Sequence, residues 1–167
     1  MVLSTHAIAG AGSAILLRNY PVLGLIIAFL SHFILDSIPH WHYKLLSREK
    51  SNSFPFGEKL NFGAKFIKDI FRTGIDFGIG FTLSLLVSQN FFPEYFLLMA
   101  LGAFAGALPD LLQVIYYRFP NFAPLFYFQK FHEKVHAKRH LDDEPIKGIF
   151  YQVAISAAVI LAVLVLR

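Results

Sequence analysis

Five long runs of apolar residues, separated by polar and charged segments, dominate this sequence. They comprise residues 2–17, 21–38, 67–88, 93–117 and 146–166. An α-helix needs about 20 predominantly apolar residues to cross the ~30 Å hydrocarbon layer of a bilayer. The pattern therefore predicts an all-α, polytopic bundle of about five membrane-embedded helices.

The first run is the shortest, and it contains Gly10 and Gly12. Because small residues let helices approach closely within a membrane, we expect it to cross at a thin point or to pack tightly against a neighbour. A signal peptide is the alternative, but no basic segment precedes the run and no clear cleavage site follows it. Residues 18–21 predict a tight turn with Pro21 at the first helical position, so the first two helices should form a hairpin.

The composition strengthens the membrane interpretation and limits the chemistry. Hydrophobic residues make up 56% of the chain, charged residues only 16%, and the mean hydropathy is +0.54; soluble domains carry about 25% charged residues. The net charge of +4 comes from basic residues in loops, so we expect no nucleic-acid partner. With no cysteine, any metal site must use histidine and carboxylate. No polar tract marks a second domain, and residues 1–167 should form one.

The loop charges predict the orientation. Lysine and arginine are enriched in short cytoplasmic loops, and the connections after the second and fourth runs hold most of the basic residues. The opposite side has little beyond Arg18 and Arg167. We therefore expect the N-terminus and residues 43–66 and 118–145 to face the cytoplasm, and the C-terminus to face outward.

Histidine and aspartate residues gather toward the predicted cytoplasmic side. Ionisable groups in or beside membrane spans are costly and usually mark function. Candidates occur on four of the runs and on the last loop: His6, His32, Asp36, His40, Asp69, Asp76, Asp110, His132 and His136.

His32 and Asp36 are four residues apart, so both project from one helical face. Together they can bind one metal, or the carboxylate can orient the imidazole. The alternative is a structural hydrogen bond between two helices. A short internal similarity between residues 36–40 and 106–110 pairs His40 with Asp110 as occupants of related positions.

His132-Glu133-Lys134-Val135-His136 matches the H-E-x-x-H pattern, in which two histidines bind zinc and the glutamate activates water. Phe128, Phe131 and Val135 form one stripe among basic residues, which predicts an amphipathic helix at the membrane surface. The alternative is a basic helix that only contacts lipid headgroups. His140 is followed by three acidic residues, and we do not place it among the ligands.

These motifs, taken in order, resemble a known family. Ser4-Thr5-His6, His32 with Asp36, Leu108-Pro109-Asp110 and the closing His132 and His136 are similar to the bacterial inner-membrane metal-dependent hydrolases, some of which are described as LexA-binding. The resemblance implies a small multi-span hydrolase with His6, His32, Asp36, Asp110, His132 and His136 at or near the metal. The chain departs from the family pattern at His40-Trp41-His42 and at Glu133.

The leading hypothesis is a membrane-embedded, metal-dependent hydrolase with a cytoplasmic-side site, acting on a lipid or another phosphoester in the bacterial inner membrane. Zn²⁺ suits imidazole and carboxylate ligands without thiolate, although Mn²⁺ and Fe²⁺ also fit. Glu133, or an aspartate that is not a ligand, would accept the proton from water. An intramembrane H-E-x-x-H metalloprotease is the alternative enzyme. The alternative without catalysis is an ion-coupled transporter or a structural membrane protein. Against a transporter, the acidic residues lie toward one end of their predicted helices, whereas transporter sites usually lie at the midplane of the membrane.

Overall fold

Helices account for most of the structure, a computed structural model that describes residues 1–137 and 141–166. Within these residues there are six α-helices, and Pro21 and Pro145 stand at the first positions of two of them, where a missing N–H costs nothing. The helices are α1 (Leu3–Leu16), α2 (Pro21–Asp36), α3 (Ala64–Phe91), α4 (Phe96–Arg118), α5 (Ala123–Val135) and α6 (Pro145–Val165).

Three segments are long and apolar enough to cross a membrane: Ala64–Phe91, Pro93–Arg118, which includes α4, and Pro145–Val165. Large apolar side chains such as Ile75, Leu97 and Val153 are exposed on their outer faces, as a lipid environment requires. The chain is therefore a helical protein with the features of a membrane protein. Helices α1 and α2 are shorter, at 14 and 16 residues, so the count of five spans stays a prediction.

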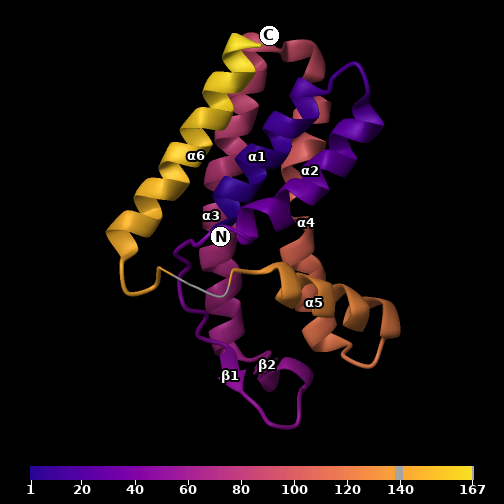
Figure 1. The fold of residues 1–167 in the computed structure, drawn as a ribbon, viewed down its shortest axis with the longest axis vertical. Helices are drawn as coiled ribbons and strands as arrows, with labels where there is room; N and C mark the ends of the chain where they lie inside the picture. The colour runs from indigo at the N-terminus through magenta and orange to yellow at the C-terminus, as the bar shows by residue number, and fades with distance from the viewer. Residues whose placement is uncertain (138–140, 167) are drawn as a thin grey trace.

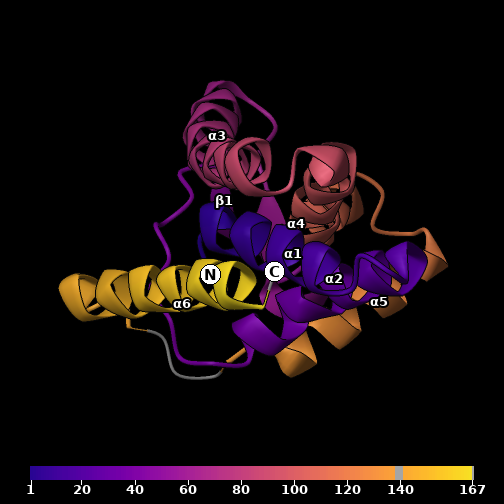
Figure 2. The same ribbon diagram turned by 90° about the horizontal axis from the view of Figure 1, so that it is seen from above.

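Helix α1 lies in the centre of the bundle and packs against α2, α3, α4 and α6, as the view from above shows (Figure 2). Its contact with α4 depends on Gly10 and Gly106. A Cβ atom at Gly106 would collide with the carbonyl oxygen of His6, and one at Gly10 would collide with that of Gly102. The close approach brings His6 of α1 toward α2 and α4.

Helix α5 runs crosswise to the long helices, and a two-stranded hairpin lies at the end of the molecule opposite the C-terminus (Figure 1). Helix α5 packs on α2, where the Phe33 ring lies 5.9 Å from Phe128 and 5.0 Å from Phe131 between ring centroids. The hairpin pairs β1 (Arg48–Lys50) with antiparallel β2 (Glu58–Leu60). The sequence patterns did not predict it; Leu60 anchors it in a small core with Tyr116 and Tyr117 of α4.

Candidate metal centre

Asp36, the last residue of α2, is the centre of the candidate site. Its side chain is 2% exposed, and Pro39 follows where the chain has left the helix, since proline cannot continue it. Among the described residues, six nitrogen atoms lie within 4 Å of its carboxylate. Those near Oδ1 are the Met1 amino group at 2.6 Å, His6 Nε2 at 3.2 Å and His40 Nε2 at 3.9 Å. Those near Oδ2 are Nε2 of His32 at 3.1 Å, of His132 at 3.2 Å and of His136 at 3.8 Å.

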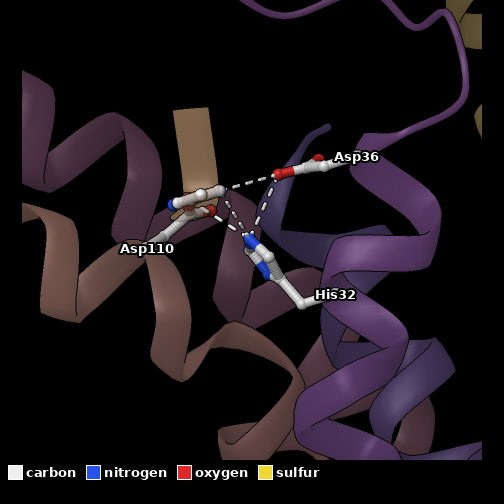
Figure 3. A group of neighbouring side chains, drawn as sticks. His32, Asp36 and Asp110 are labelled. Carbon is white, nitrogen blue, oxygen red and sulfur yellow. Dashed lines mark hydrogen bonds and ion pairs between the residues drawn. The ribbon is translucent and has the colours of Figure 1, made fainter. Parts of the chain in front are cut away.

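His32 faces two carboxylates at once. Its Nε2 lies 3.1 Å from Asp36 Oδ2 and 3.7 Å from Asp110 Oδ1. Figure 3 shows His32 and Asp36 on α2 and Asp110 on α4 converging on a common point. Nε2 of His132, from α5, lies 3.4 Å from the same His32 atom. The four ligand atoms of these residues all lie within 4.8 Å of one another.

A hydrogen bond to the backbone determines which nitrogen of His32 faces this point. His32 Nδ1 lies 2.9 Å from the carbonyl oxygen of Gly106. A carbonyl oxygen only accepts, so Nδ1 carries the proton and, in the neutral ring, Nε2 presents a lone pair. A lone pair directed at two carboxylates requires either a second proton on His32 or a cation between the groups. Histidine ligands of metals ordinarily donate their other N–H to such a carbonyl.

His40 shows the same arrangement in the loop after α2. Its Nδ1 donates to the carbonyl oxygen of Ile38 at 2.7 Å, so Nε2 faces the Met1 amino group at 2.8 Å and, further away, Asp36. Burial, together with the positive charge of Met1, lowers the pKa of His40 to about 3, which keeps the ring neutral. Sequence reasoning left His40 out of the ligand set. Its four-residue spacing from Asp36 and the preceding Pro39 were the signals.

His136 is brought to Asp36 by backbone pairing. It is the residue directly after α5, one turn after His132, and its N–H donates to the His132 carbonyl at 3.0 Å. The next N–H, of Ala137, donates to the carbonyl oxygen of Asp36 at 2.8 Å. Burial lowers the pKa of His136. Asp36, His40 and His136 form a second group whose ligand atoms lie within 4.8 Å of one another.

His6 is fully buried and stacks on His32 with 3.9 Å between ring centroids. Among the described residues, neither of its ring nitrogens makes an aligned hydrogen bond, although Nε2 lies 3.2 Å from Asp36 Oδ1. Nδ1 of His132 also has no hydrogen-bond partner in this part of the chain. Buried polar atoms are rarely left without a partner, so these atoms indicate a polar ligand or ion that the protein alone does not supply.

Glu133 is directed elsewhere. It is exposed, its Oε1 accepts a hydrogen bond from Gln129 at 2.8 Å, and its charge acts on Arg48 beside the hairpin. The structure thus brings together the six predicted metal ligands but does not place the predicted catalytic Glu133 with them in the described contacts. His140 lies outside the described residues.

Asp69 and Asp76 have other roles. Asp69 is buried and accepts hydrogen bonds from the backbone of Leu46 and Ser47, which fixes the chain before the hairpin. Asp76 accepts from the Leu3 N–H at 2.7 Å and from the Tyr43 hydroxyl at 3.4 Å.

The site is open on the side of Asp110 and His136. Their side chains are 30% and 28% exposed, whereas those of His6, His32 and His132 are at most 2% exposed. Burial, together with the charges of Asp76 and Asp110, raises the pKa of Tyr43. Arg72 stacks over the Tyr43 ring with its Cζ 5.2 Å from the centroid.

No family model, curated protein or solved structure matches the chain.

Proposed function

We propose that this chain is a membrane-embedded, metal-dependent hydrolase. The observation that carries the proposal is the convergence of His32, Asp36, Asp110 and His132, with the His32 lone pair directed at two carboxylates. Nitrogen and oxygen ligands without thiolate favour Zn²⁺, with Mn²⁺ or Fe²⁺ as alternatives. A metal bound there would lower the pKa of a bound water and polarise the substrate oxygen under attack.

The residues around this point have distinct roles in the proposal. His32, Asp36 and His132 are buried and hold the metal. Asp110 lies on the open side, where one carboxylate oxygen can reach the metal while the other accepts a proton from water. We assign the role of proton acceptor to Asp110 in place of Glu133, because the Glu133 side chain contacts Gln129.

The substrate class that fits best is an anionic membrane lipid or a related phosphoester. A cavity of about 410 Å³ lies between α1, α2 and α6, with Gly12, Leu35 and Val159 among its lining residues. Its lining is largely apolar and includes Leu35, the residue before Asp36, so it would suit an acyl chain. Arg72, whose guanidinium lies over the ring of Tyr43, would suit a negatively charged headgroup.

The membrane arrangement follows the same proposal. Helices α1 and α2 are embedded with α3, α4 and α6, which makes five, and α5 lies at the interface. The site and the basic loops lie at the cytoplasmic side. The resemblance to bacterial inner-membrane metal-dependent hydrolases favours the inner membrane as the location.

The proposal is tested with full-length protein purified in detergent. Metal content is measured after purification, and hydrolysis of anionic phospholipid vesicles and of p-nitrophenyl phosphate is measured after addition of Zn²⁺ or Mn²⁺. Asp36→Asn should lose both metal and hydrolysis, and the control His42→Ala, which changes a neighbouring, partly exposed loop histidine, should keep both. If Zn²⁺ and Mn²⁺ neither bind nor raise the thermal stability, the hydrolase proposal is wrong and a structural or ion-coupled role is favoured.

A further inference from the structure

The two oxygen atoms of Asp36 face overlapping sets of nitrogen atoms. Oδ2 lies 3.1 Å from His32 and 3.2 Å from His132, on the side of Asp110. Oδ1 faces His40 Nε2 at 3.9 Å and the Met1 amino group at 2.6 Å. His136 lies beside His40, with 5.0 Å between their ring centroids, and its Nε2 is 3.8 Å from Oδ2.

Two potential metal-binding groups therefore meet at one residue. The first comprises His32, Asp36, Asp110 and His132, and the second Asp36, His40 and His136. Asp36 is the one member common to both groups among the described residues. A carboxylate can give one oxygen to each of two metals, and hydrolases with two metals hold them about 3.5–4 Å apart.

We propose that the chain binds two divalent cations bridged by Asp36. The second cation is held by Asp36, His40 and His136. The inference rests on the proposed function for the first cation, and it adds a site to it.

The second group has the chemistry that such a site needs. The hydrogen bond from His40 Nδ1 to the Ile38 carbonyl oxygen leaves Nε2 as the ligand atom. The N–H of Leu141 donates to the carbonyl oxygen of His40 at 3.0 Å, which holds the loop after α2 against the chain after α5. The Met1 amino group already lies between Asp36 Oδ1 and His40 Nε2, at 2.6 and 2.8 Å. Asp36 Oδ1 and His40 Nε2 thus both face the positive charge of the Met1 amino group, and a bound metal would take the place of that amino group.

The second cation also narrows the substrate class. His136 of the second group is 28% exposed and Asp110 of the first is 30% exposed, so each group has a member that solvent reaches. Two metals bridged by one carboxylate suit an in-line displacement at phosphorus, where attacking and leaving oxygen atoms both carry charge. A phosphoester is therefore favoured over a peptide.

The stoichiometry of Mn²⁺ binding tests the inference. Full-length protein in detergent is freed of metal with a chelator and titrated with Mn²⁺, and bound metal is counted while electron paramagnetic resonance is recorded. We expect two Mn²⁺ per chain and the spectrum of a spin-coupled pair. His40→Ala should bind one Mn²⁺, with the six-line spectrum of an isolated ion and a second binding step weakened at least about 100-fold. His42→Ala is the matched control, and it should bind two.

The outcomes separate the two proposals. One Mn²⁺ in both the wild type and His40→Ala would refute the second site and leave the first intact. Loss of all metal in His40→Ala, with the helical circular dichroism unchanged, would refute the division into two sites. No metal in the wild type would refute the hydrolase proposal as well. If His40→Ala does not fold, His136→Ala at the end of α5 is measured instead, and it should also bind one.

Discussion

Nε2 of His32 and Nε2 of His132 lie 3.4 Å apart, although the two residues are separated by a hundred positions in the chain. Both atoms also face Asp36 Oδ2, at 3.1 and 3.2 Å. Two imidazole nitrogens this close to each other and to one carboxylate oxygen are stabilised by a shared cation, either a proton or a metal. The distinction between these two cations underlies the predictions below.

Removing one ligand of the first metal should weaken binding far more than removing a histidine nearby. His32→Ala and His132→Ala should each weaken Zn²⁺ binding by about 100-fold or more, because loss of a neighbour that only orients a ligand costs about 10–100-fold. His42→Ala should bind as the wild type does, since its ring lies 3.2 Å from Asp142 in a more exposed position. Competition titration with a chelating dye measures this. Equal affinity in all three variants would contradict a metal site at Asp36.

Replacing Glu133 separates the hydrolase from an H-E-x-x-H protease. Glu133→Gln should keep the metal and change the hydrolysis rate by less than about tenfold, whereas Asp110→Asn should lower it by about 10²–10⁴-fold, the range for a general base. Rates on vesicles and on a transmembrane peptide would be compared. Loss of peptide cleavage in Glu133→Gln, with the metal retained, would favour the protease.

The contact of α1 with α4 should tolerate no added methyl group at Gly106. Gly106→Ala would force its Cβ against the carbonyl oxygen of His6, and overpacking of this kind costs about 1–3 kcal/mol. It would also move the carbonyl group that orients His32, so metal affinity should fall with stability. Gly78→Ala in α3 is the control, since no atom lies within 4 Å of the added Cβ. It should be neutral or stabilising by up to about 1 kcal/mol, because alanine favours helix.

The stability of the metal-free protein should fall in acid, partly through His40. Its pKa is lowered from 6.5 to about 3 in the folded protein, so between these values the unfolded chain takes up a proton that the folded chain does not. The contribution of the neutral, buried His40 to the free energy of unfolding is therefore fully present above pH 6.5, and it is lost as the pH falls toward 3. Thermal unfolding of protein kept in chelator should show a smaller decrease between pH 7.5 and 4.5 for His40→Gln than for the wild type. An identical decrease would show that His40 is not buried in neutral form.

Topology is the remaining prediction. A reporter fused after residue 167 should be outside, and reporters within residues 43–66 and 118–145 should be cytoplasmic. If the C-terminal reporter is cytoplasmic, the five-helix count is wrong, and the short helix α1 is the first place to look.

The helices were largely predictable because their signals are local. The second apolar run was expected to begin at Pro21, as α2 does, and the last was expected at residues 146–166, where α6 spans Pro145–Val165. The central position of α1 was not predictable. An apolar helix has the same pattern whether lipid or protein surrounds it, and only its small residues suggested close packing.

The site was predictable in parts. Four-residue spacing put His32 and Asp36 on one face, but their meeting with His132 depends on the crosswise placement of α5, which no local pattern contains. His40 was named among the polar candidates but left out of the ligand set, because it lies beyond the end of α2, where the four-residue spacing from Asp36 is a weaker guide than inside a helix. The catalytic role predicted for Glu133 came from a motif that defines spacing along a helix and not which side of that helix faces the neighbouring elements; in the structure Glu133 contacts Gln129. The hairpin was missed because its strands have only three residues each.

The burial of α1 within the other helices has a consequence for the order of assembly during synthesis. Helix α1 is made before α6, one of the helices that enclose it, which begins some 130 residues after α1 ends. At 5–20 residues per second, roughly 6–26 s pass before the synthesis of α6 begins. Until then α1 lacks this neighbour, and α2, the next helix in the chain, is the first one that it can pack against.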